Sequence, residues 1–223
     1  MSRRALSDNR ARAVMAPGDE ATVDDGRFYA SSLQRALDLA AVTQPHPNPR
    51  VGCVIVVDGA VVGEGAHERA GEPHAEIIAL AAAGDQARVA TAVVTLEPCS
   101  HHGRTPPCTQ ALIAAGVARV VVGAVDPDSR VSGSGIAELE NAGIEVIIDT
   151  QPQLVEALDP GYFHHRRTGR PLVTLKLATT MDGQIAAADR TSQWITGEAA
   201  RRDGHRLRAE ADVVLVGAGT VLD

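Results

Sequence analysis

Four residues with metal and proton chemistry constrain this chain most strongly. His74 and Glu76 stand two residues apart, and two cysteines follow at positions 99 and 108. His74 comes directly after a proline, at the start of a run rich in alanine, leucine and isoleucine that predicts a helix. Cys99 follows a valine-rich segment that predicts a buried strand, and Cys108 opens a second predicted helix. We therefore expect the fold to bring these four residues together.

The four residues have the composition of a hydrolytic zinc centre. His74, Cys99 and Cys108 supply three ligands for tetrahedral zinc and leave the fourth position open for water. Glu76 is then free to transfer protons. The order His-x-Glu, Pro-Cys and Cys is the signature of zinc deaminases that act on nucleobase-like amidines.

Two structural alternatives stay open from the residues alone. His101 or His102 could supply a fourth ligand, which would make a closed structural zinc site without catalysis. Glu76 could be a solvated residue on a helix face. Cys53 lies within the apolar run 51–57, and we interpret it as a small buried side chain rather than a ligand.

Hydrophobic patterning predicts an α/β unit over residues 26–150. The pair Asp58-Gly59 separates two apolar runs and suits the type I′ turn of a β-hairpin. Strands that are joined by helical crossovers are parallel, so we expect a mixed five-stranded sheet with helices on both faces. The expected elements are, in chain order, a helix over 28–42, strands over 51–57 and 60–64, a helix over 74–83, a strand over 92–96, a helix over 108–115, a strand over 119–125, a helix over 136–142 and a strand over 144–148.

The remaining segments predict a tail, a linker and part of a second domain. Residues 1–25 contain no apolar run, so they predict a disordered tail rather than a signal peptide. The polar segment 151–170 is interpreted as a linker with one short helix. Within residues 171–223 we expect a strand over 172–177, a basic helix over 199–211 and a strand over 213–216. Two strands bury too little surface to fold alone, so this portion is expected to be incomplete or to lean on the first domain.

Composition argues against several partners. The net charge of −7 and the aromatic content of 2% disfavour nucleic acid, which is held by basic surfaces and aromatic platforms. No apolar stretch approaches the 20 or so residues of a membrane span. Three cysteines, two of them in a metal pattern, suggest no disulfide framework and indicate the reducing cytoplasm.

Longer motifs carry a specific resemblance over residues 26–223. Residues 95–108 read TLEPCSHHGRTPPC, and with His74 and Glu76 they resemble the deaminase domain of bifunctional riboflavin-biosynthesis deaminase/reductases. The long loop between the cysteines differs from the C-x-x-C spacing of cytidine and tRNA adenosine deaminases. Segments of the second portion resemble the start of that family's reductase domain; they are KLA at 176–178, MDG at 181–183, SQWIT at 192–196 and GAGTV at 217–221.

The resemblance implies a fold and two activities. A cytidine-deaminase-like α/β/α sandwich would be followed by the start of a dihydrofolate-reductase-like α/β domain. The first domain would use zinc to hydrolyse the ring amino group of 2,5-diamino-6-ribosylamino-4(3H)-pyrimidinone 5′-phosphate. The second would use NADPH to reduce the ribosyl group of the deaminated product to ribityl. A small phosphorylated pyrimidine as substrate and a homo-oligomeric state are also implied.

The same resemblance implies roles for individual residues. It assigns zinc binding to His74, Cys99 and Cys108, and proton transfer to Glu76. The other positions that match functional positions of the family are Asn48, His67 and Arg104 in the deaminase pocket, Ala178, Trp194 and Thr220 at NADP contacts, and Ser192 and Arg208 at reductase substrate contacts. An asparagine amide can read the edge of a pyrimidinone, and an arginine can hold a phosphate.

Two other functions are weighed against this expectation. One is a deaminase of tRNA or single-stranded DNA, which the acidic, aromatic-poor composition disfavours. The other is a non-catalytic, zinc-stabilised module, which would unfold when zinc is removed. Because the family's reductase domain continues beyond position 223, we expect this chain to deaminate but not to reduce.

Overall fold

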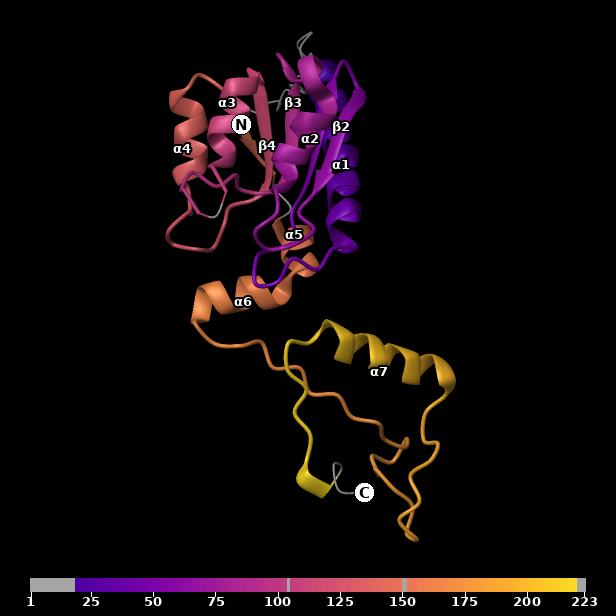
Figure 1. The fold of residues 1–223 in the computed structure, drawn as a ribbon. Helices are drawn as coiled ribbons and strands as arrows, with labels where there is room; N and C mark the ends of the chain where they lie inside the picture. Colours follow the sequence, from indigo (N-terminus) through magenta and orange to yellow (C-terminus); the bar gives the residue numbers. More distant parts are fainter. Residues whose placement is uncertain (1–18, 104, 150–151, 220–223) are drawn as a thin grey trace, which may run out of the picture. The chain divides into compact units, whose positions relative to one another are not determined.

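The computed structural model of the chain describes residues 19–103, 105–149 and 152–219 (Figure 1). It forms two compact units, Met1–Leu172 and Val173–Asp223. The first unit contains the sheet and the candidate site.

A mixed five-stranded sheet forms the centre of the first unit, as predicted. Its strand order is β2-β1-β3-β4-β5. β1 pairs antiparallel with β2 and with β3, whereas β3 with β4 and β4 with β5 are parallel. The strands are β1 (Gly52–Val57), β2 (Ala60–Ala66), β3 (Thr91–Leu96), β4 (Arg119–Ala124) and β5 (Glu145–Ile148). Asp58 and Gly59 join β1 to β2 with φ angles of 47° and 79°, the positive values that a type I′ turn requires.

Helices cover both faces of this sheet (Figure 1). One face packs against α2 (Ala75–Ala83), α3 (Cys108–Ala115) and α4 (Ser134–Asn141), and the other against α1 (Asp19–Ala41), α5 (Pro152–Leu158) and α6 (Pro160–Thr168). Successive residues of a strand point to opposite faces, so Val94 packs in the first layer and Val93 in the second. Both are fully buried, which explains why the central strands are runs of valine rather than alternating patterns. Each buried valine contributes roughly 1.5–3 kcal/mol.

The first helix begins earlier than predicted. α1 starts at Asp19, so residues 19–25 are helical and do not belong to a disordered tail. The absence of proline between Pro17 and Pro45 leaves nothing in the backbone to prevent the longer helix. The rest of the predicted tail, residues 1–18, lies outside the described residues.

Residues 151–170 do not form a linker with one short helix. Within the described part they form α5 and α6, and these helices bury Val155 (1% exposed) and Phe163 (3% exposed) against the sheet layer. Asp159 caps α6 by accepting a hydrogen bond from the backbone N–H of Tyr162 at 3.3 Å. Its other carboxylate oxygen accepts from the N–H of Arg50 at 3.1 Å. The segment is polar overall, but Val155 and Phe163 pack into the core of the first unit.

The second unit contains one longer helix and no strand among residues 173–219. The helix is α7 (Glu198–Glu210), which agrees with the predicted basic helix over 199–211 within one residue at each end. The segments 172–177 and 213–216 were expected to be strands but are irregular here. Val173 and Leu215 are 82% and 94% exposed. A strand needs a neighbour to accept and donate its backbone hydrogen bonds, and neither segment pairs with one in the part described.

Candidate metal centre and active site

The ligand-type residues lie where elements begin or end. His74 is the N-cap residue of α2, which starts at Ala75. Cys99 lies in the loop that follows β3, and Cys108 is the first residue of α3. Carboxyl ends of parallel strands and amino ends of the following helices meet at one edge of an α/β sheet. The topology therefore brings these three side chains together.

Their atoms are spaced as a zinc ion requires. The Nδ1 atom of His74 lies 3.3 Å from Sγ of Cys108 and 3.6 Å from Sγ of Cys99. All three ligand atoms lie within 4.8 Å of one another. A tetrahedral zinc ion with bonds of about 2.0–2.3 Å holds its ligand atoms roughly 3.5 Å apart. Among the described residues no fourth histidine, cysteine or carboxylate joins the cluster, so His101 and His102 do not close it.

Hydrogen bonding and burial shift the pKa values of the two thiols in opposite directions. The hydrogen bond from the Cys108 thiol holds the pKa of Cys99 well below that of an ordinary thiol. The same bond, together with burial, raises the pKa of Cys108. The backbone N–H of Cys108, at the start of α3, also points to Sγ of Cys99 at 3.5 Å. A divalent cation at this cluster would hold both sulfurs as thiolates.

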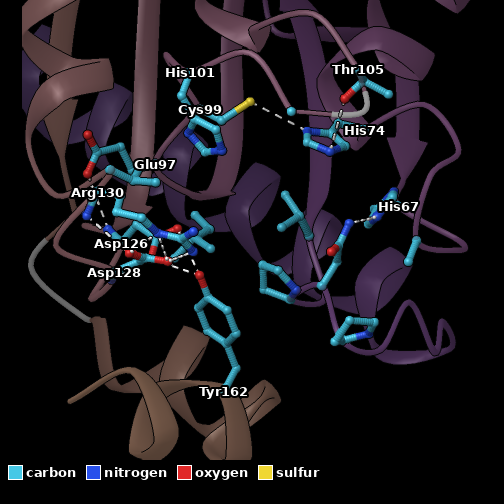
Figure 2. A pocket seen from close by; sticks show the side chains of 18 of the residues that line it. His67, His74, Glu97, Cys99, His101, Thr105, Asp126, Asp128, Arg130 and Tyr162 are labelled. Carbon is cyan, nitrogen blue, oxygen red and sulfur yellow. Dashed lines mark hydrogen bonds and ion pairs between the residues drawn. The ribbon is translucent and has the colours of Figure 1, made fainter. Parts of the chain in front are cut away.

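Thr105 orients the imidazole of His74. Its hydroxyl lies 3.4 Å from Nε2, on the side of the ring away from the sulfurs (Figure 2). A proton on Nε2 leaves the Nδ1 lone pair free for a metal. A ligating histidine usually donates its far ring N–H to an oxygen acceptor, and the hydroxyl of Thr105 is placed to be that acceptor.

Glu76 is buried rather than solvated. It is 3% exposed and lines the same cavity as His74 and Cys99. Burial raises its pKa to about 7, and the charge on Cys99 acts in the same direction. A carboxyl group with this pKa both accepts and donates protons near neutral pH.

His67 and Asn48 form a hydrogen-bonded pair in the cavity wall. Nδ1 of His67 lies 3.0 Å from the carbonyl oxygen of Pro73, so this nitrogen carries the proton that is donated. Burial lowers the pKa of His67, which keeps the ring neutral and leaves Nε2 as an acceptor. Nδ2 of Asn48 lies 3.0 Å from Nε2 and donates to it. The amide of Asn48 is thereby fixed, with its oxygen left to accept a hydrogen bond.

Glu97 anchors the loop that carries Cys99. Its buried carboxylate accepts from the backbone N–H groups of Gly133 and Gly135, each at 2.9 Å, and from that of Asp126 at 3.2 Å. Gly133 and Gly135 lie at the start of α4, where the helix dipole favours a negative charge. The strand end that leads to Cys99 is therefore tied to a neighbouring helix.

A cavity of about 410 Å³ connects these groups. Asn48, His67, His74, Glu76 and Cys99 all line it, and Cys108 is buried beside it as the third member of the metal cluster. The predicted Arg104 lies outside the described residues. His101, considered above as a possible zinc ligand, also lines the cavity. Sequence reasoning assigned no role to the further lining residues, which are Glu97, Thr105, Asp126, Asp128, Arg130, Tyr162 and Arg166. The acidic pair directly after β4 could have been noticed, because it follows a strand end, whereas Tyr162 and Arg166 lie in the segment taken as a linker.

The residues predicted to serve reduction lie in the second unit. Trp194 is 70% exposed, with the guanidinium carbon of Arg201 4.4 Å from the centre of its ring. Ser192 and Arg208 are exposed and Ala178 is half-buried, while Thr220 lies outside the described residues. Their assignment to cofactor and substrate positions stays a prediction.

Two family models match the chain. The cytidine and deoxycytidylate deaminase zinc-binding region matches residues 28–124, and the RibD C-terminal domain matches residues 171–223. The riboflavin biosynthesis protein RibD of Escherichia coli is 54% identical over 192 residues, which cover 85% of this chain and 52% of that protein. RibD of Aquifex aeolicus is 50% identical and has 54% of its length covered. The chain thus spans about half the length of the curated relatives it matches.

Solved structures agree with this relationship. Acinetobacter baumannii RibD superposes with a TM-score of 0.79 at 49% identity, over 83% of this chain and 52% of that one. A Thermotoga maritima diaminohydroxyphosphoribosylaminopyrimidine deaminase/5-amino-6-(5-phosphoribosylamino)uracil reductase gives a TM-score of 0.83 at 42% identity, over 89% of this chain and 58% of that one.

The fold and the His/Cys/Cys cluster define the first unit as a zinc-binding deaminase domain of the cytidine-deaminase type. The relationship continues into the second unit, where the start of the RibD C-terminal domain is present. Over 85% of its length the chain is similar to the RibD riboflavin biosynthesis proteins, and its last part matches their C-terminal domain.

Proposed function

We propose that the first unit hydrolyses the ring amino group of 2,5-diamino-6-ribosylamino-4(3H)-pyrimidinone 5′-phosphate and releases ammonia. The observation that carries this proposal is the buried carboxyl of Glu76 beside a three-ligand cluster with no fourth protein ligand in the described part of the chain. The substrate is supported by the names of the relatives, whose enzymes deaminate a diaminohydroxyphosphoribosylaminopyrimidine. Riboflavin biosynthesis is the pathway that these names give.

In this proposal His74, Cys99 and Cys108 hold zinc. A zinc ion held there would lower the pKa of a water molecule to about 7 and so supply a nucleophile at neutral pH. Glu76 would carry one proton of the attacking water to the ring nitrogen. It would then carry the second, from the hydroxyl group added to the ring carbon, to the amino group, which leaves as ammonia while the carbonyl forms. Its pKa of about 7 suits both steps, since the same group must accept and donate.

Asn48 and His67 orient the substrate ring. The tautomer of His67 requires Asn48 to donate with its amide nitrogen, so the amide oxygen can accept from an N–H of the pyrimidinone. Arg104 is retained as the proposed phosphate contact on its match to the family motif.

Ammonia release from the purified chain tests this function. We expect the zinc-loaded protein to deaminate the phosphoribosylaminopyrimidinone. Mass spectrometry should show that cytidine, dCMP and tRNA adenosine are not deaminated. Cys108→Ser should lose zinc and activity together, whereas Cys53→Ala, a change at a buried strand cysteine that is not part of the cluster, should keep both. Faster turnover of cytidine or dCMP would contradict the proposed substrate.

For the second unit we infer that Ala178, Trp194 and Thr220 stand at positions that contact NADPH in reductase domains of this type, and that Ser192 and Arg208 stand at positions that contact the product of deamination. The match of residues 171–223 to the RibD C-terminal domain supports this inference. We also propose that the protein works in the reducing cytoplasm, which suits a site built on two free thiols, and as a homo-oligomer. No described helix is long and apolar enough to cross a membrane.

A further inference from the structure

The cavity has a second polar end, built from elements that do not contribute to the metal cluster. Asp126, Asp128 and Arg130 come from the loop after β4, and Tyr162 and Arg166 come from α6. Figure 2 shows Tyr162 extending from its helix toward Asp126 and Asp128, on the opposite side of the cavity from His67. None of these five residues takes part in the proposed deamination step.

These side chains hold one another in place. The hydroxyl of Tyr162 donates to Asp126, with oxygen distances of 2.9 and 3.1 Å. Arg130 and Arg166 converge on Asp128 from two different elements, at 2.6 and 3.5 Å. The guanidinium carbon of Arg166 also lies 5.1 Å from the centre of the Tyr162 ring. The network is therefore fixed before a ligand arrives.

The balance of charge indicates what this end can accept. The carboxylates of Asp126 and Asp128 face two guanidinium groups, and the carboxylate of Glu97 lies beside Asp126, so this end has no excess of positive charge and presents acceptors and donors side by side. A phosphate dianion would meet the repulsion of both carboxylates. Neutral hydroxyl groups, which donate to a carboxylate and accept from a guanidinium, suit such a cluster. Carboxylates are also the common partner of ribose hydroxyls in nucleotide sites.

One donor at this end still lacks a partner. The Nε atom of Arg166 is buried and has no hydrogen-bond acceptor within the described part of the chain. Buried polar groups are nearly always satisfied, so an orphaned donor beside a cavity points to a ligand atom.

We propose that Asp126, Asp128 and Arg166 bind the ribosyl hydroxyl groups of the substrate, with Tyr162 positioning Asp126. The inference rests on the proposed function, since it assigns the sugar of that substrate to the end of the cavity away from the metal cluster. It makes α6 a wall of the deaminase site. The alternative is that the network only fastens α6 to the sheet.

Two substrates separate a sugar subsite from a structural fastening. One is the phosphoribosylated pyrimidinone and the other is 2,5,6-triamino-4(3H)-pyrimidinone, the same ring without its sugar phosphate. We expect Arg166→Met and Asp126→Asn to lower kcat/KM about tenfold for the first, mainly through KM, and to leave the second unchanged. Arg167→Met is the matched control, because Arg167 neighbours Arg166 on α6 but pairs with Glu156. Equal losses on both substrates would overturn the proposal in favour of a structural role.

Direct binding tests the same subsite without turnover. By calorimetry the wild-type protein should bind ribose 5-phosphate more tightly than 2-deoxyribose 5-phosphate, and Asp126→Asn should abolish this preference. Absence of any preference in the wild type would overturn the proposal. A second pair of results would also overturn it. If Asp126→Asn keeps the preference for ribose 5-phosphate and Arg166→Met no longer binds inorganic phosphate, this end of the cavity binds the phosphate group and not the sugar hydroxyls. If the wild type binds with the expected preference but releases no ammonia from either ring, the proposed deamination fails and the sugar subsite stands.

Discussion

Glu76 shows how surroundings turn an ordinary residue into a proton carrier. In sequence, a glutamate two residues after a histidine at the start of a helix is an ordinary surface residue. In this fold its carboxyl group is enclosed by the first turn of α2 and by Cys99, so the charged form loses hydration and gains a negative neighbour. Both effects raise the pKa, and the result is a group that titrates near neutral pH.

Asp128 shows the opposite environment, with a consequence for stability. Its hydrogen bonds with Arg130 hold the pKa well below the ordinary value of 3.8. A carboxyl whose pKa is depressed by folding stabilises the protein above its unfolded pKa and loses that contribution as the pH falls toward the folded value. We expect Asp128→Asn to cost about 1 kcal/mol at pH 7, in the range of a part-exposed arginine–carboxylate pair.

Urea unfolding at two pH values checks this expectation. The gap in unfolding free energy between wild type and Asp128→Asn should narrow when the pH is lowered from 7 to below about 4. A gap that stays constant over this range would show that Asp128 acts through packing instead of charge.

At the scale of elements, α2 must lie very close to β2 for the site to form. A Cβ atom on Gly63 would stand 2.3 Å from the backbone oxygen of Ala79, and one on Gly65 would stand 2.4 Å from that of Ala75. Both glycines therefore allow the helix to pack directly on the strand. The amino end of α2 places His74 and Glu76, so this contact sets the position of the metal cluster relative to the sheet.

Gly65→Ala should displace the start of α2. Because the clash is with backbone, we expect a loss of about 1–3 kcal/mol in unfolding free energy and weaker zinc binding. Gly161→Ala is a matched control, since Gly161 lies in α6, has an ordinary φ, and a methyl group added to it would meet no atom within 4 Å. Zinc titration and thermal unfolding of both variants check this, and unaltered zinc affinity in Gly65→Ala would contradict it.

Much of the first unit could be predicted from local pattern. The hairpin turn follows from Asp58-Gly59 and the strands from their valine runs. A glycine after a helical run marks a helix end in the same local way, and Gly116 ends α3 with a left-handed φ of 70°. α6 could not be found this way. Its role depends on Phe163 reaching a core made by α1 and the sheet, which is a tertiary contact that a polar sequence does not reveal. Tyr162 and Arg166, at the second polar end of the cavity, were missed for the same reason.

At the scale of the molecule, the two units differ in how fully their backbones are paired. Every strand described in the first unit has a partner, and its central valines are fully buried. In the second unit the two expected strands are unpaired within the described residues, and their apolar side chains are largely exposed. A nicotinamide site needs a scaffold that holds its residues rigidly, which unpaired segments do not supply.

We therefore expect no NADPH oxidation by the 223-residue chain when the deaminated product is supplied. The NADPH absorbance should fall no faster than in the protein-free control, while ammonia is still released from the deaminase substrate. Steady NADPH oxidation that depends on the product would show that residues 171–223 form a working reductase site.

The central claim is that Glu76 moves protons at a zinc site which it does not help to build. Glu76→Gln keeps the shape of the side chain and removes its ability to titrate. We predict near-stoichiometric zinc in the purified variant and a fall in ammonia release of about 10²–10⁴-fold. Loss of zinc along with activity, or full activity with zinc retained, would contradict this claim.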